Sequence, residues 1–145
     1  MIDNRREFLT AAMTAMATTF ISAREQAPPA QANNAQRAVA TKDAPKVNLD
    51  GWQMTATEIT LPAGAPPGRK HRHPGFVIGY VLEGQYSFAV NDQPATVVKA
   101  GDMFFESFDA PGQVHSTSGN ASSTQACKFL AIVFTKKGDP VTIPG

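Results

Sequence analysis

The sequence predicts an all-β protein with one folded domain, a small jelly-roll-like barrel. Two observations support this fold class. Short runs of alternating polar and apolar residues recur between turn signals, and no helical periodicity is visible beyond the N-terminal segment. Eleven glycines and eleven prolines suit many short strands joined by turns, and 145 residues allow one domain. Such strands close into a sandwich or barrel with room for a core and a small cavity.

The N-terminal residues 1–32 are expected to be a removable export signal. Asn4–Thr10 contains Arg5-Arg6 followed by Phe8-Leu9 and resembles the twin-arginine signal. The apolar stretch 11–21 is shorter and more polar than the roughly 20 residues that a membrane span needs. The alternative is an amphipathic N-terminal helix with a coincidental arginine pair. We expect a periplasmic or secreted mature chain without a membrane span.

Residues 33–46 are rich in Ala, Pro, Asn and Gln and are expected to form a disordered linker. The barrel is predicted over residues 47–137, and residues 138–145 are predicted to be a C-terminal tail. Alternation and turn residues predict about eight strands, one of them around the histidines and the others at 53–61, 77–82, 85–90, 95–99, 102–106, 114–117 and 127–134.

Composition narrows the classes of partner. The chain is 42% hydrophobic and 17% charged, with a net charge of +1, which gives no reason to expect nucleic acid or an anionic membrane. Cys127 is the single cysteine, so no intramolecular disulfide can form. It alternates with Phe129, Ala131 and Val133 and is therefore expected to be a small buried apolar residue.

The three histidines of the chain predict a metal site. His71 and His73 would point the same way on an extended strand, since side chains alternate with period two. His115 follows about forty residues later. Three imidazoles suit a divalent metal, and Fe, Mn, Zn, Ni and Cu are not distinguished by these ligands.

Two stretches carry a resemblance to a known family. The matching residues are His71, His73, Tyr80, Val81, Leu82, Glu83 and Gly84 in the first stretch, and Gly101, Asp102, Pro111, Gly112, His115 and Asn120 in the second. They resemble the two motifs of the cupin superfamily, over residues 52–134. The resemblance implies a β-barrel with a metal in its mouth, and a homodimer that shares edge strands.

The resemblance also implies two classes of function. The first is a metal-dependent enzyme acting on a small organic molecule as an oxygenase, isomerase or decarboxylase. The second is a non-catalytic cupin that binds a small molecule, and a ligand-free dimerisation barrel is a weaker third alternative. Fold alone does not choose among them.

One departure from the family pattern concerns the acidic ligand. The glutamate of the first motif should fall four residues after His73, where this chain has Val77. Without it the metal would keep a charge of +2 and a further open position. Glu106 is the nearest replacement and is our candidate catalytic residue. The sequence leaves it as a fourth ligand, a general base or a surface residue. Val77, Tyr80, Phe88 and Phe104 are expected to line the pocket.

Overall fold

The computed structural model describes residues 36–108 and 112–145, and the predicted export signal lies outside these residues. The described part is all-β, as predicted. Its strands are β1 (Trp52–Leu61), β2 (His71–Arg72), β3 (Gly75–Glu83), β4 (Gln85–Val90), β5 (Thr96–Lys99), β6 (Met103–Glu106), β7 (Val114–Asn120), β8 (Cys127–Lys136) and β9 (Ile143–Pro144). Within these residues no helix is present that could cross a membrane.

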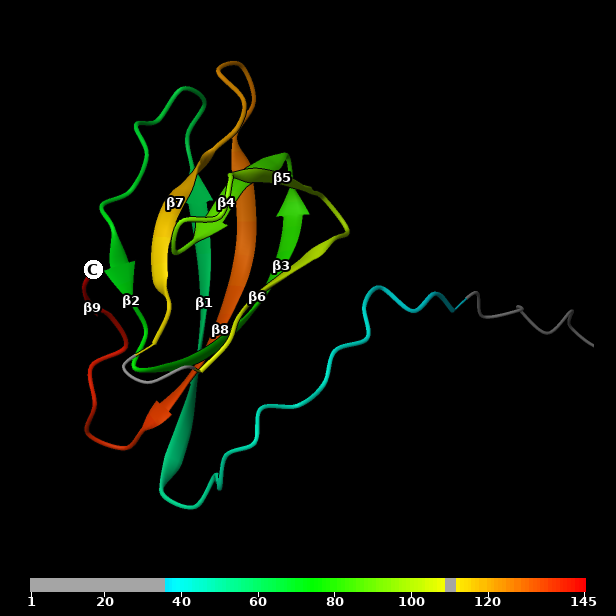
Figure 1. Cartoon of the computed structure of the whole chain (residues 1–145). Coiled ribbons are helices and arrows are strands. Elements are labelled where there is room, and N and C mark those ends of the chain that lie inside the picture. Colours follow the sequence, from blue (N-terminus) through cyan, green and yellow to red (C-terminus); the bar gives the residue numbers. More distant parts are fainter. Residues whose placement is uncertain (1–35, 109–111) are drawn as a thin grey trace, which may run out of the picture. The chain divides into compact units, whose positions relative to one another are not determined.

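The strands form two antiparallel sheets (Figure 1). One has the order β1-β8-β3-β6 and the other the order β5-β4-β7-β2-β9. The chain passes from one sheet to the other at Pro74, because β2 belongs to the five-stranded sheet and β3 to the four-stranded sheet. The single histidine strand of the prediction is therefore a two-residue strand followed by a crossing.

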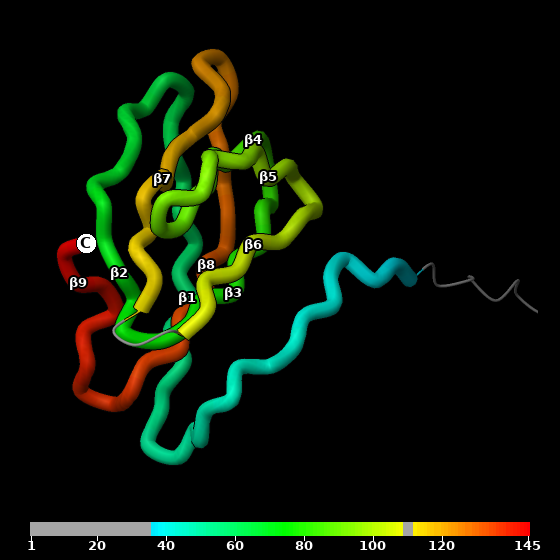
Figure 2. The backbone as a smooth tube through the Cα atoms, in the orientation of Figure 1, coloured from blue at the N-terminus to red at the C-terminus, as the bar shows by residue number. Residues whose placement is uncertain are grey.

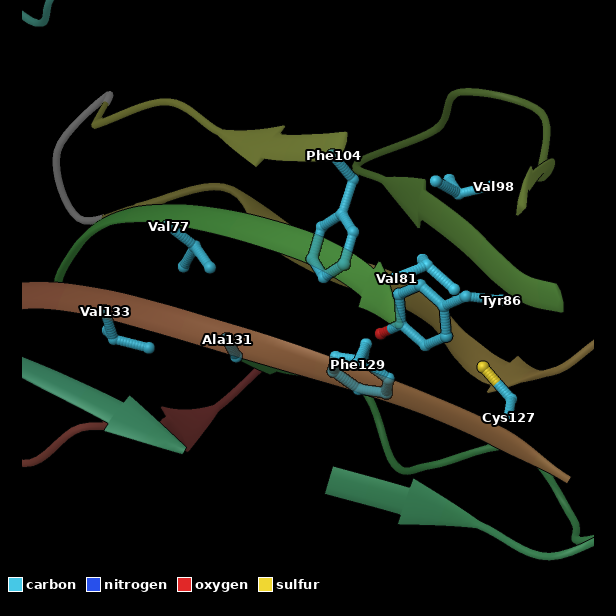
Figure 3. Packing of buried hydrophobic residues seen from close by; sticks show 9 residues of the cluster. All are labelled: Val77, Val81, Tyr86, Val98, Phe104, Cys127, Phe129, Ala131 and Val133. Carbon is cyan, nitrogen blue, oxygen red and sulfur yellow. The ribbon is translucent and has the colours of Figure 1, made fainter. Parts of the chain in front are cut away.

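The core lies between the two sheets. Along β8, buried and half-buried residues alternate from Cys127 to Thr135, so every second side chain faces inward. Cys127 is fully buried and unpaired, which confirms its expected place in the core. Figure 3 shows side chains of β3, β4, β5, β6 and β8 meeting in this layer, with the rings of Tyr86, Phe104 and Phe129 side by side.

Gly79 makes room for one of the aromatic rings of this core, that of Phe104. A Cβ at Gly79 would lie 2.0 Å from the Phe104 ring, which comes from the neighbouring strand β6. A residue without a side chain therefore leaves room for that ring beside β3.

Residues with positive φ occupy two of the connections between strands. Gly84 has φ +73° in the tight connection between β3 and β4, and Asn91 has φ 52° after β4. Asn120, a residue of the second motif, holds a different connection in place. Its Nδ2 donates to the carbonyl oxygens of Leu61, Pro62 and Gln125 at 3.3, 3.0 and 2.7 Å. Its role in the fold is therefore to join the loop after β7 to the end of β1.

The C-terminal residues return to the barrel. β9 pairs with β2, with His71 opposite Pro144 and Arg72 opposite Ile143. In Figure 2 the red C-terminal end runs beside β2. The tail therefore adds the last strand of the five-stranded sheet next to the histidines.

Candidate metal centre

The structure brings the three histidines together at one end of the barrel. His71 on β2 lies directly opposite His115 on β7, with ring centroids 4.8 Å apart. The ring of His73 lies 5.0 Å from that of His71 and nearly perpendicular to it. One ligand nitrogen from each residue lies within 4.8 Å of the others. Two segments distant in sequence thus form one cluster, as the motif spacing predicted.

Backbone carbonyls fix the tautomers of the first two histidines. The Nδ1 of His71 lies 2.9 Å from the carbonyl oxygen of Arg69, and the Nδ1 of His73 lies 2.6 Å from that of Val141. A carbonyl only accepts, so each Nδ1 carries the proton and donates it. Each Nε2 is then left with a free lone pair, which is the form that binds a metal.

Tyr86 and Ser118 hold the third histidine. The hydroxyl of Tyr86 lies 3.2 Å from His115 Nε2 and 2.8 Å from the Ser118 hydroxyl. When His115 Nε2 donates to Tyr86 and Tyr86 donates to Ser118, the chain of hydrogen bonds is complete. The Nδ1 of His115 then keeps its lone pair. This nitrogen is buried and has no hydrogen-bond partner within the described residues.

Glu106 lies beside this nitrogen. Its Oε1 is 3.2 Å from His115 Nδ1 and 4.0 Å from His73 Nε2. The residue is 3% exposed, so the surface alternative for Glu106 is wrong. Burial raises the pKa of Glu106 to about 7. Both carboxyl oxygens lack a hydrogen-bond partner within the described residues.

The buried histidines are neutral in the metal-free chain. Burial lowers the pKa of His115 to about 3, and the nearby His71 and His73 lower it further. Burial also lowers the pKa of His73. The contact between His115 and Glu106 is therefore not an ion pair near neutral pH, although the two groups are close enough to form one.

These groups fit a divalent cation. A metal ligand must present a lone pair, and the cluster offers deprotonated nitrogens together with a buried carboxyl group. Buried polar atoms without partners are rare in folded proteins and call for a physical cause. An ion bound between His115 Nδ1 and Glu106 would supply the missing partner for both.

The cluster opens into a cavity of about 240 Å³ between the sheets. Apolar side chains form most of its wall, and the polar groups gather on the histidine side. The lining residues outside the cluster are Thr57, Ile59, Leu61, Val77, Tyr86, Phe104, Ser118, Phe129, Ala131, Val133, Val141 and Thr142. An apolar cavity with a few converging polar groups is the usual form of a small-molecule site.

The four residues predicted to line the pocket lie in three kinds of place. Val77 and Phe104 line the cavity. Phe88 packs against His115 and Phe104, with ring centroids 5.1 and 4.9 Å away. Tyr80 lies on the outer face of β3, because its position alternates with the inward-facing Gly79 and Val81. Tyr86 supplies the tyrosine of the cavity instead.

Three residues of the site were not predicted from the sequence, namely Val141, Ser118 and Tyr86. Tyr86 alternates with Phe88 on β4, so its inward direction could be read from the sequence. Ser118 and Val141 carry no such signal. Val141 acts through its carbonyl oxygen, and its position depends on the return of the C-terminal segment along β2.

Gly112 sets the approach of the second motif to the first. It has φ +104°, and a Cβ there would lie 2.2 Å from the carbonyl oxygen of His73. The carbonyl of Gly112 accepts a hydrogen bond of 3.1 Å from Arg72. A glycine is needed here for both its positive φ and its close contact with the histidine strand.

A larger groove lies along β3 and β6 of the four-stranded sheet, and Val77 and Glu106 line both this groove and the cavity. The volume of the groove is about 820 Å³, and residues 42–47 form one side of it opposite Phe76, Ile78, Phe105 and Phe134. None of the three histidines lines this groove. Size alone would favour it as a binding site, but the convergent ligand groups favour the smaller cavity.

Comparison with known proteins gives the family. A family model described as the cupin domain matches residues 57–133, which is more than half of the chain. The chain therefore belongs to the cupin family. No curated protein matches the sequence significantly.

One solved structure shares the fold with a TM-score of 0.50, and two others superpose less closely. The DMSP lyase DddQ from Ruegeria pomeroyi superposes with a TM-score of 0.50 and 21% identity, over 63% of this chain and 42% of the lyase. Oxalate decarboxylase from Bacillus subtilis, whose structure concerns its Mn(II) centres, gives a TM-score of 0.49 and 21% identity over 63% of this chain and 23% of that enzyme. An RmlC-like cupin from Methanocaldococcus jannaschii gives a TM-score of 0.46 and 20% identity, over 68% of this chain and 84% of that protein. The chain spans less than half of the lyase and of the decarboxylase.

Proposed function

We propose that this cupin binds a divalent metal through His71, His73 and His115 and acts on a small organic molecule, as an oxygenase, isomerase or decarboxylase. The observation that carries the proposal is the convergence of three histidine nitrogens within 4.8 Å at the wall of a largely apolar cavity. A barrel that had lost its metal would have no need to keep unpartnered nitrogen and carboxyl groups buried there.

The residues of the chain have separate tasks in this proposal. A bound divalent metal supplies Lewis-acid chemistry toward an oxygen group of the substrate. The carbonyls of Arg69 and Val141 orient two imidazoles, and Tyr86 orients the third. Phe104 and Val77 exclude water from the floor of the cavity. Glu106 is the carboxyl group of the reaction centre and remains the proposed catalytic residue.

The cavity limits the size and polarity of the substrate. A volume of about 240 Å³ lies below the roughly 300–1,000 Å³ of sites for drug-sized ligands. No lysine or arginine lines it within the described residues, so a negatively charged substrate would find no cationic side chain. We therefore propose a compact, largely apolar molecule with one oxygen group directed at the histidines, which in the case of a decarboxylase is a carboxylate that binds the metal.

Metal analysis followed by a turnover screen tests the proposal. The purified chain should retain about one transition-metal ion, and the variant H71A/H73A should retain none. The Fe, Mn, Ni, Zn and Cu forms are then incubated with small hydroxy, keto and enol compounds while oxygen uptake and NMR spectra are followed. Metal-dependent turnover supports an enzyme. Ligand binding without turnover supports the non-catalytic alternative, and a chain that binds no metal overturns the proposal.

We further propose that two copies pair through the four-stranded sheet. β1 and β6 are its edge strands, and its outer face carries a continuous apolar row that includes Ile78, Phe105 and Ile132 in adjacent register positions. A second copy would cover this row and pair an open edge. Sedimentation analysis of the wild type and I132K tests it. A dimer that becomes a monomer in I132K supports the pairing, and a wild-type monomer contradicts it.

Export to the periplasm is also proposed. Its support is the Arg5-Arg6 pair followed by Phe8-Leu9. The R5K/R6K variant, expressed with the full N-terminal segment, should remain inside the cell while the wild type is recovered from the periplasmic fraction. Equal distribution of the two would contradict this assignment.

A further inference from the structure

This chain has Val77 on β3 where the family has its acidic ligand, and a glutamate, Glu106, lies opposite that position on β6. Val77 faces the cavity and is 2% exposed, so its isopropyl group occupies the place where a carboxylate would reach the histidines. In the antiparallel register, Glu106 lies directly opposite Val77. Residues opposite each other on neighbouring strands point to the same face, with Cβ atoms about 4.5–5.5 Å apart. A carboxylate from position 106 can therefore reach the space above Val77.

The contacts of Glu106 place it at the histidine nitrogens. Its Oε1 lies 3.2 Å from His115 Nδ1 and 4.0 Å from His73 Nε2. Two ligand atoms each about 2.1 Å from one ion lie about 3 Å apart at a right angle and about 4.2 Å apart when opposite. Both contacts of Glu106 fall within this range. The carboxyl group thus lies at ligand-sharing distances from two of the histidines, whereas the ligand atoms within 4.8 Å of one another belong to the three histidines alone.

Burial gives an independent reason for a cation beside Glu106. Both carboxyl oxygens are buried without a hydrogen-bond partner within the described residues, and no lysine or arginine lines the cavity on the histidine side, whereas Lys42 and Lys46 line the groove on the other side of Glu106. His115 Nδ1 faces Oε1 with no partner of its own. Two facing acceptors repel each other unless a proton or a cation lies between them. A divalent ion shared by both removes this repulsion.

We propose that Glu106 is the fourth protein ligand of the metal, delivered from β6 in place of the glutamate that Val77 replaces. The inference rests on the proposed metal site and changes its chemistry. The carboxylate reduces the net charge of the centre from +2 to +1, so the expectation of a fully cationic three-histidine site is replaced. One coordination position fewer then remains for water and substrate.

The test compares metal binding among three variants and the wild type. E106Q removes the charge and keeps the shape, whereas V77E/E106V moves the carboxylate back to β3. E83Q is the matched control, because Glu83 is exposed and lies at the end of β3 away from the cavity. Dissociation constants for Mn²⁺ are measured by competition titration, and water-proton relaxation of the Mn²⁺ forms reports the number of bound waters.

We expect E106Q to bind Mn²⁺ at least tenfold more weakly than the wild type and to show higher relaxivity, because a water replaces the lost ligand. V77E/E106V should return to within about threefold of the wild type, and E83Q should match it. Unchanged affinity and relaxivity in E106Q, with the wild type still binding Mn²⁺, overturn the ligand role and leave the three-histidine site intact. Weaker binding with unchanged relaxivity would mean that Glu106 only positions His115, and this result also overturns the ligand role. If the wild type binds no metal, the proposed function itself fails.

E106Q alone decides whether Glu106 is a metal ligand, even if the V77E/E106V variant does not fold. Circular dichroism and thermal unfolding are recorded for each variant, so that a loss of metal binding is not mistaken for a loss of structure.

Discussion

His71 lies directly opposite His115 in the register between β2 and β7, with their ring centroids 4.8 Å apart. A two-residue strand therefore joins the two motifs, although about forty residues separate them in sequence. A shift of one residue in this short pairing would turn His71 away from His115, because successive side chains point to opposite faces. The metal centre depends on this register and on the groups that hold it.

Tyr86→Phe tests the hydrogen bond that orients His115. The phenol oxygen lies 3.2 Å from His115 Nε2 and 2.8 Å from Ser118. Loss of a partner that orients a ligand typically weakens metal binding by about 10–100-fold, so we expect a loss in this range for Y86F. Isothermal titration with Zn²⁺ or Mn²⁺ measures it. An affinity within twofold of the wild type would show that Tyr86 does not orient the ring.

Removal of residues 141–145 tests the contribution of the tail. The truncation deletes the carbonyl of Val141, which accepts from His73 Nδ1, and the strand β9 that pairs with β2. We expect metal affinity to fall by about 10–100-fold, since His73 loses the partner that fixes its tautomer. V141A is the control, because it keeps the carbonyl and should retain most of the affinity. Equal binding by the truncated chain would contradict the prediction.

Gly79→Ala tests the packing below the site. The added Cβ would lie 2.0 Å from the Phe104 ring, which would have to move against Tyr86 and Phe129 or into the adjoining cavity. Overpacking of this kind costs about 1–3 kcal/mol, which we expect as a decrease in the free energy of unfolding in urea. Gly119→Ala is the control, since its Cβ would meet only Pro67 at 3.5 Å and its φ is not positive. Equal stabilities for the two variants would argue against tight packing at Gly79.

The stability of the metal-free chain should rise with pH and level off near neutrality. The pKa of His115 falls from 6.5 to about 3 on folding and that of His73 also falls, so the unfolded chain binds more protons below pH 6.5. The stability that these two histidines contribute to the folded chain is present above pH 6.5 and is lost as the pH falls. The pKa of Glu106 rises from 4.5 to about 7, so its contribution is present at low pH and is lost as the pH rises through 7.

The two effects oppose each other between pH 4.5 and 6.5, and the two histidines outweigh the one carboxyl group. We expect the free energy of unfolding to decrease as the pH falls below 6.5 and to be nearly independent of pH above about 7. Urea unfolding in EDTA at pH 4–8 measures this profile. In E106Q the rise between pH 4.5 and 7 should be steeper than in the wild type, because the opposing contribution of the carboxyl group is removed, and an equal slope in the two proteins would refute this assignment.

Sequence patterns were sufficient for most of the fold and for the histidine cluster. Period-two alternation in β1, β4 and β8 and the glycines of the turns can be recognised in the amino-acid sequence itself, since each is a local property of the chain. His71, His73 and His115 could be placed together because the two motifs resemble those of a family with a fixed topology.

Other features of the site depend on pairings that local patterns do not contain. The position of Glu106 opposite Val77 follows from the register of β3 and β6, which are separated by two other strands in the chain. The direction of Tyr80 depends on how the chain crosses between sheets at Pro74. The approach of Val141 to His73 requires the path of the last residues, for which the sequence gives no periodic signal.

The crossing at Pro74 has a mechanical consequence. His71 belongs to a strand of the five-stranded sheet, whereas Glu106 belongs to the four-stranded one, and the cavity lies between them. An ion coordinated by both would clamp the two layers at the open end of the barrel, where β2 and β9 are only two residues long. Amide hydrogen exchange in these two short strands should therefore slow on loading, while exchange in the long strand β8 should change little.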